Sequence, residues 1–99
     1  MIEPEQYRSI SIVVTGIYVN SFKDAYAQGL ESGDYAKLRT RYEQLVARVK
    51  SLCEEFGVSA PSWVNSSAPG TITADWYSTV VSGAESVVNA AADKITSEE

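Results

Sequence analysis

Apolar residues recur every three or four positions between residues 34 and 56, which is the period of an α-helix with one buried face. The periodic positions are Tyr35, Leu38, Tyr42, Leu45, Val49, Leu52 and Phe56. Gly33 and Asp34 precede this run, and an aspartate there can accept hydrogen bonds from the first free backbone amides. Gly57 follows it and can adopt the left-handed conformation that ends many helices. We therefore predict an amphipathic helix over residues 34–56.

A second segment with the helical period lies near the C-terminus. Its apolar positions are Tyr77, Val81, Ala84, Val88, Ala91 and Ile95. Two of them are alanines, so we expect another helix to approach this side closely. The pattern predicts a helix over about residues 72–97.

The segment between these two helices cannot continue either of them, because Pro61 and Pro69 interrupt it. We predict a loop over about residues 57–71. It contains Trp63, and we expect this large aromatic side chain to hold the loop over the open end of the helical bundle.

Residues 4–31 permit two interpretations. The stretch Ser9–Thr15 begins by alternating polar and apolar residues and is rich in β-branched side chains, as a strand would be, and Gly16 could then form a turn. Pro4, followed by Glu5 and Gln6, instead resembles the first turn of a helix. Because an isolated hairpin is only marginally stable, we predict one helix over residues 4–31. A short N-terminal β-hairpin followed by helices is the alternative.

The first predicted helix carries apolar residues on nearly every side. The side expected to face the bundle carries Tyr7, Val14, Tyr18, Phe22 and Ala25. A neighbouring face carries Ile10, Val13 and Ile17, and a third carries Ile12 and Val19. No charged residue occurs between residues 9 and 22, and this run is too short to span a bilayer. We therefore expect it to be buried within the fold or against another molecule.

The six residues Leu30-Glu31-Ser32-Gly33-Asp34-Tyr35 resemble the inter-helix turn of tetratricopeptide-type repeats. The resemblance implies antiparallel pairing of the first two helices. No period near 34 residues returns in the rest of the chain, so we do not predict a repeat protein. The predicted fold is one all-α domain over residues 1–99, an up-down-up three-helix bundle.

Composition excludes several kinds of chemistry. The chain has no histidine and one cysteine, so it lacks an imidazole base, a Ser-His-Asp or Cys-His couple and the paired thiolates of a structural zinc site. Glu31 and Asp34 are spaced as a carboxylate pair, but they flank the Gly33 turn, where we expect a helix cap. We expect a protein that is not an enzyme and that binds no cofactor or metal. Cys53 is expected to be a small buried hydrophobe, and a cytoplasmic location or an intracellular assembly suits a lone thiol.

Charge is distributed unevenly along the chain. The formal net charge is −5, from 13 acidic and 8 basic residues. Residues 37–50 carry five cations and one acid, a local charge of +4, which leaves −9 on the rest of the chain. Arg39 with Glu43, and Lys50 with Glu54, are spaced to pair on the helix surface. The remaining cations of this segment form a line of candidate partner-binding residues, namely Lys37, Arg41 and Arg48.

Two functional hypotheses follow from these patterns. The first is a non-enzymatic interaction or assembly subunit, which docks into a larger complex or self-associates through Ile10, Val13 and Ile17. The alternative is a small acidic stoichiometric inhibitor or adaptor, comparable in size and charge to antitoxins and phage anti-defence proteins, that occupies a basic surface. Three cations on an acidic protein are a weak footprint for nucleic acid, so the expected partner is a protein.

Overall fold

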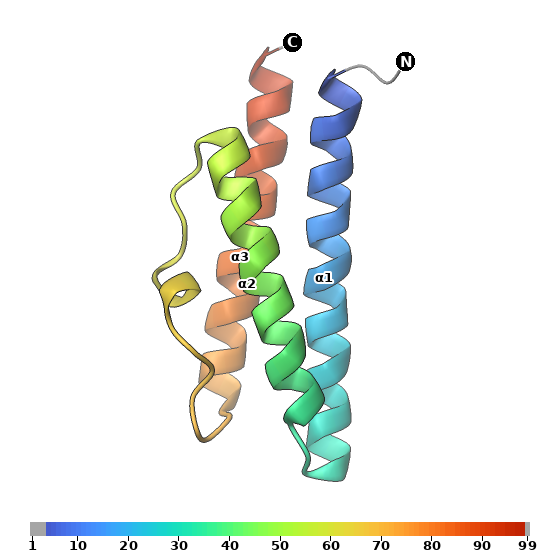
Figure 1. Cartoon of the computed structure of the whole chain (residues 1–99), viewed down its shortest axis with the longest axis vertical. Helices are drawn as coiled ribbons and strands as arrows, with labels where there is room; N and C mark the ends of the chain where they lie inside the picture. The colour runs from blue at the N-terminus through green and yellow to red at the C-terminus, as the bar shows by residue number, and fades with distance from the viewer. Residues whose placement is uncertain (1–3, 99) are drawn as a thin grey trace.

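The computed structural model describes the backbone of residues 4–98 and the side chains of residues 10–95. Three helices, α1 (Pro4–Ser32), α2 (Ala36–Phe56) and α3 (Ala74–Glu98), form a bundle, and a short 3-10 helix, η1 (Ser62–Asn65), lies in the connection between α2 and α3 (Figure 1). No strand occurs between residues 4 and 98. The all-α three-helix class is confirmed, and the alternative of an N-terminal β-hairpin is wrong.

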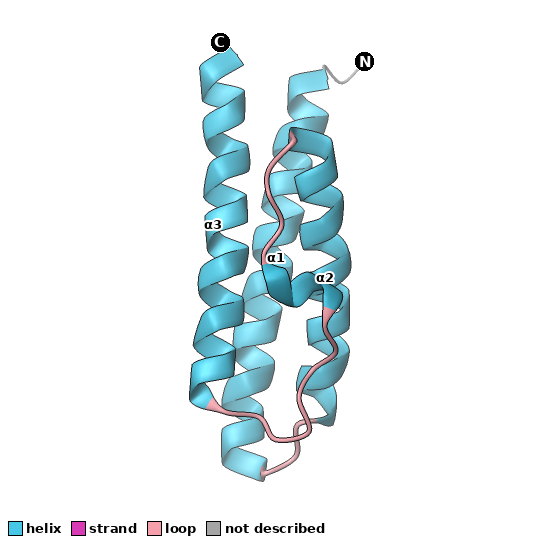
Figure 2. Ribbon diagram, turned by 90° about the vertical axis from the view of Figure 1, so that its left-hand side faces the viewer, coloured by secondary structure: helices cyan, strands magenta, loops and turns pink. Residues whose placement is uncertain are grey.

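The direction of α3 differs from the up-down-up order that we predicted. Tyr26, near the end of α1, stacks on Tyr77 at the start of α3, so these two helices are antiparallel. Tyr42, near the start of α2, packs against Trp76 at the start of α3, so these two run parallel (Figure 1). The connection 57–73 runs back between α2 and α3 to make this possible (Figure 2). An extended chain covers about 3.3 Å per residue and a helix about 1.5 Å, so this connection is long enough to retrace α2.

Glycines at positive φ end the first two helices. Gly33 has φ of +80° and donates its amide hydrogen to the carbonyl of Gly29, 2.7 Å away. The Asp34 carboxylate accepts a hydrogen bond from the Ala36 amide at 3.0 Å, as expected, but the N-cap residue of α2 is Tyr35, because α2 begins two residues later than predicted. Gly57, at φ of +67°, ends α2 as predicted.

The buried face of α1 is rotated from the one that we predicted. Phe22 and Ala25 are buried as expected, but Val14 and Tyr18 are only half-buried. Val19, which we placed on a third face, is buried, together with Thr15, whose hydroxyl donates to the carbonyl of residue 11 at 2.8 Å. The side chain of Tyr7 lies outside the described residues. Periodicity does not fix the face of a helix that is apolar nearly all round.

The cores of α2 and α3 follow their periodic stripes with one adjustment. In α2 the predicted positions are buried, apart from the half-buried Tyr35, and Cys53 is buried beside them. In α3, Ala84 and Ala91 are buried as predicted, whereas the fully covered valines are Val80 and Val87. At both positions the buried valine is therefore the residue before the valine that we predicted. Phe22, Tyr26, Tyr42, Trp76 and Tyr77 fill the space between the helices at the turn end of the bundle.

Three side chains hold the 57–73 connection against the helices. Trp63 is buried, and its indole covers Gly83 of α3 so closely that a Cβ there would lie 2.6 Å from Nε1. The Tyr42 hydroxyl lies 2.7 Å from two carbonyl oxygens, those of Trp63 and Ser66, which share its single proton. The Arg39 guanidinium donates to the carbonyls of residues 69 and 70, at 2.7 and 2.9 Å. The helix η1, which contains Trp63, lies along the side of the bundle (Figure 2), and the indole packs on Gly83 in the middle of α3, so Trp63 is not over the end of the bundle as we predicted.

Candidate functional site

Three apolar side chains of α1 point away from the core. Ile10, Val13 and Ile17 are 49%, 61% and 60% exposed, and their spacing places them on one side of the helix. They are the residues that the sequence nominated for partner binding, and the structure brings them together. Leu30 is also 60% exposed, but it lies about 20 Å further along the helix axis. These four are the exposed large hydrophobic residues among the described side chains. We call Ile10, Val13 and Ile17 the α1 stripe.

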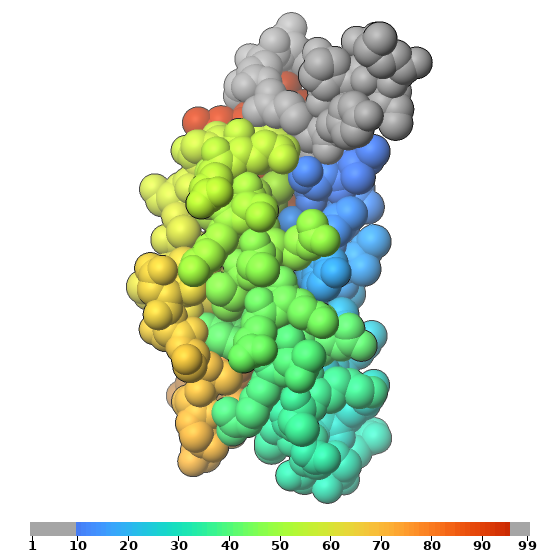
Figure 3. All heavy atoms as spheres, in the orientation of Figure 1, coloured from blue at the N-terminus to red at the C-terminus, as the bar shows by residue number. Residues whose placement is uncertain are grey.

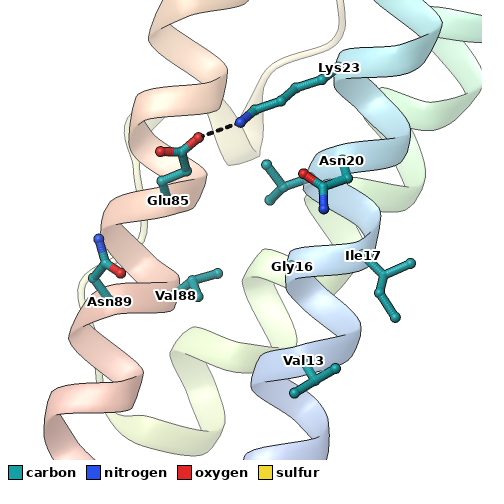
Figure 4. Close-up of a pocket in the computed structure, with 9 residues that line it drawn as sticks. Val13, Gly16, Ile17, Asn20, Lys23, Glu85, Val88 and Asn89 are labelled. Carbon is teal, nitrogen blue, oxygen red and sulfur yellow. Dashed lines mark ion pairs between the residues drawn. The ribbon is translucent and has the colours of Figure 1, made fainter.

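A groove of about 430 Å³ between α1 and α3 borders the α1 stripe. Figure 4 shows Val88 of α3 pointing towards α1, while Ile17 points away from α3. Gly16 leaves open space in the wall of the groove, because a Cβ at this position would meet no atom within 4 Å. The lining residues are Val13, Gly16, Ile17, Val19, Asn20, Lys23, Glu85, Val88 and Asn89.

An ion pair spans the groove on the side of the turn between α1 and α2. The Lys23 ammonium lies 2.8 Å from a carboxylate oxygen of Glu85 (Figure 4). This hydrogen bond raises the pKa of Lys23. Since these two are the charged residues of the lining and neutralise one another, the groove presents a neutral surface.

The other two grooves of the bundle are covered. The 57–73 connection lies over the side between α2 and α3 and leaves two pockets against α2, of about 290 and 430 Å³, and in the space-filling view it covers the left edge of α2 (Figure 3). Contacts between α1 and α2 bridge the remaining groove, among them a hydrogen bond of 3.1 Å from Ser11 to Glu55. The α1–α3 groove differs from these two pockets in that helices alone form its walls.

The three predicted cations lie away from the α1 stripe. The guanidinium carbon of Arg48 lies 5.1 Å from the centre of the Tyr18 ring, a cation–π distance. The Lys37 ammonium donates to the Gln28 side-chain carbonyl at 3.1 Å, so both cations contact α1 from α2. Arg41 donates to Gln44 of its own helix at 3.3 Å. Each cation has a partner within the chain, and none of them lines the α1–α3 groove.

Two residues of this surface, Gly16 and Val88, were not expected from the sequence. Gly16 was considered only as a turn of the hairpin alternative, although in a helix it falls three residues after Val13, on the same side. Val88 was assigned to the core of α3, but it is half-buried and faces the groove. The position of Gly16 could have been found from helical spacing, whereas that of Val88 depends on how α1 and α3 pack.

Comparison of the chain with protein-family models, curated proteins and solved structures finds no match. A functional proposal for this chain therefore rests on its own structure. Within the described residues, no group of three or more His, Cys, Asp or Glu side chains is placed to hold a metal ion. The helices, over the same part of the chain, are too short or too polar to cross a membrane.

Proposed function

We propose that this protein is a non-enzymatic assembly subunit, which works by docking the α1 stripe against another protein chain. The observation that carries the proposal is the exposure of Ile10, Val13 and Ile17 beside an open, neutral groove. A helix of a small bundle needs one apolar face for its core. In α1 that face is made of other residues, among them Val19 and Phe22, so the α1 stripe is surplus to the fold.

The size of the α1 stripe suits a specific contact. Covering one aliphatic side chain that is already half-buried contributes about 1–2 kcal/mol, because roughly half of its apolar area is removed from water. Three such side chains contribute about 3–6 kcal/mol, which is comparable to the lower end of the entropic cost of association, so the groove wall and the apolar side chains of the partner must supply the remainder. The same side chains contribute little to the isolated fold, since more than half of Val13 and Ile17 remains in water.

The chemistry of the surface favours a protein partner. Phosphates of nucleic acids and anionic headgroups of lipids are held by lysine and arginine side chains. Lys23, the cation of the groove lining, is paired with Glu85, and the exposed Asp24 follows it. An apolar helix face of another protein matches this surface better, because it needs shape and no charge.

The absence of catalysis is part of the proposal and rests on residue types. The chain has no histidine, and the two titratable groups of the groove are tied to one another. Burial and the nearby Glu54 carboxylate raise the pKa of the Cys53 thiol, which keeps it protonated and unreactive. We place the protein in a reducing compartment such as the cytoplasm, where a lone thiol stays reduced.

The proposal is tested with the variants Val13→Glu and Ile17→Glu, using a dye that fluoresces on apolar surfaces. We expect the wild type to bind the dye and both variants to bind much less, with unchanged far-UV circular dichroism. Leu30→Glu is the matched control, because Leu30 is as exposed as Ile17 but lies outside the α1 stripe. A wild type that binds no dye at a concentration where it sediments as a monomer would contradict the proposal, and so would unfolding of both variants, which would make these residues part of the core.

A further inference from the structure

We infer that the occupant of the α1 stripe and its groove is a second copy of this chain, packed antiparallel through α1 about a two-fold axis near Gly16. The inference rests on the proposed function and narrows it to one partner. The shape of the groove wall, the side chains beside it and their charge support this arrangement.

The α1 wall of the groove has the geometry of a knob-into-hole socket. In packed helices, each side chain of one helix enters a hole formed by four residues of the other. Val13, Gly16, Ile17 and Asn20 line the groove, and they occupy positions i, i+3, i+4 and i+7, which outline one such hole. Gly16 keeps the hole deep, because it has no side chain and nothing else fills the space beside it.

The side chain that fits this hole lies on the same surface. Ile17 is 60% exposed and points away from α3, so it can enter the hole of a facing helix (Figure 4). A surface that carries both the knob and the hole is complementary to itself. Self-complementary surfaces pair across a two-fold axis, and such dimers are the commonest protein oligomers.

Charge favours the antiparallel arrangement and is compatible with a second copy as the partner. Residues 9–22 are uncharged, so a strongly acidic or basic partner would find no opposite charge there. A second copy offers a neutral apolar face of the same size. In a parallel pair, the exposed Asp24 carboxylates of the two copies would be neighbours and would repel each other. An antiparallel pair centred near Gly16 places them at opposite ends of the contact.

The first test measures molecular mass by sedimentation over a range of protein concentrations. The chain mass is 10.8 kDa, and we expect the wild type to approach twice that value as concentration rises. Ile17→Glu should raise the dimer Kd by about a hundredfold, because it places two carboxylates in an apolar contact. Leu30→Glu adds the same charge at an equally exposed position and should leave Kd unchanged.

A second variant separates the contact from the fold. Gly16→Ala adds a methyl group where the isolated chain has open space, and alanine favours a helix, so the monomer should become more stable. The same methyl group occupies the hole that receives Ile17, so the dimer Kd should rise by about tenfold. A fold that strengthens while the dimer weakens is the expected signature. A Kd that Gly16→Ala leaves unchanged or lowers would overturn the inference.

The outcomes distinguish the inference from the proposed function. A wild type that remains a monomer at every concentration, yet binds the apolar dye through Val13 and Ile17, overturns the second copy as occupant and leaves contact with a different protein standing. A monomer that binds no dye overturns both. A dimer that Ile17→Glu does not weaken overturns the inference, because its contact then lies elsewhere.

Discussion

Two helical glycines of this chain have opposite surroundings. A Cβ at Gly83 would lie 2.6 Å from the Trp63 indole nitrogen and 3.2 Å from Pro61, whereas a Cβ at Gly16 would meet nothing within 4 Å. Gly83 is therefore needed for the close approach of the connection to α3. Gly16 has no such role within the chain, which is why we assign its open space to a partner.

This difference predicts opposite effects of the same substitution. Gly83→Ala should lower the free energy of unfolding by about 1–3 kcal/mol, because the buried Trp63 ring must move. Gly16→Ala should raise it by about 0.5–1 kcal/mol through helix propensity. Urea unfolding at low protein concentration measures both without a contribution from assembly. Equal effects of the two substitutions would contradict the packing of Trp63 on Gly83.

The buried phenol of Tyr42 predicts a loss of stability at alkaline pH. Burial raises the pKa of Tyr42, so above about pH 10 the unfolded chain loses this proton before the folded chain does. The free energy of unfolding should therefore fall as pH rises from that point towards the folded pKa. Tyr77, whose pKa burial also raises, contributes with the same sign.

Lys23 and Cys53, whose pKa values are also raised, contribute with the same sign, so Tyr42→Phe removes one of several contributions and should make the alkaline decline shallower. At neutral pH the variant should be less stable by about 1–2 kcal/mol, because the carbonyls of Trp63 and Ser66 lose their donor. Thermal unfolding followed at several pH values measures both effects. An alkaline decline as steep as that of the wild type would show that Tyr42 ionises equally easily in the folded and the unfolded chain.

At the scale of elements, the course of the 57–73 connection allows α3 to run parallel to α2. Arg39 is one of the residues that hold this connection in place. Its guanidinium donates to two backbone carbonyls of the connection, a fork-shaped contact that lysine cannot reproduce. Arg39→Ala should lower the free energy of unfolding by about 1–2 kcal/mol. Amides of η1 should also exchange faster with deuterium. Arg39→Lys is the control for charge and should recover only part of the loss; full recovery would assign the effect to charge alone.

Helix positions were predictable from this sequence, whereas their mutual arrangement was not. In α2 the apolar residues form a single stripe between two glycines, so the last residue and the buried face could be predicted, and the predicted start was two residues early. In α1, apolar residues such as Val14 and Val19 surround the axis, and only contact with α2 and α3 selects the buried ones. The direction of α3 could not be predicted, because a connection of this length permits either a reversal or a crossover.

Because the arrangement of the helices could not be predicted, only part of the candidate site could be predicted from the sequence. Ile10, Val13 and Ile17 were nominated because they form a separate face of α1, which their spacing alone establishes. The groove beside them requires α3 at a particular position, and periodicity within one helix contains no information about it. The line of cations on α2 was also nominated, but its contacts with Tyr18 and Gln28 depend on the packing of α1 against α2.

At the scale of the whole molecule, an acidic chain presents a neutral contact surface. Each chain carries a net charge of −5, but the α1 stripe and residues 9–22 carry none. Two copies therefore repel weakly at a distance and attract through apolar contact. Salt should therefore affect assembly only through the repulsion between the chains.

Raising NaCl from about 0.05 to about 0.5 M should leave the dimer Kd unchanged or lower it slightly, because salt screens like charges on the two chains. Sedimentation at the two salt concentrations measures this directly, with Leu30→Glu as a folded control of altered charge. A Kd that rises steeply with salt would mean that ion pairs hold the copies together, contrary to a neutral interface.

The most direct test of the central claim is an isotope-filtered NOE experiment on a mixture of labelled and unlabelled chains, which detects contacts between copies only. The claim is that copies of this chain meet through the outward face of α1. It predicts intermolecular signals from the methyl groups of Val13 and Ile17 to each other, and from Val13 towards Asn20. Intermolecular signals confined to other residues, or their absence in a sample that sediments as a dimer, would contradict it.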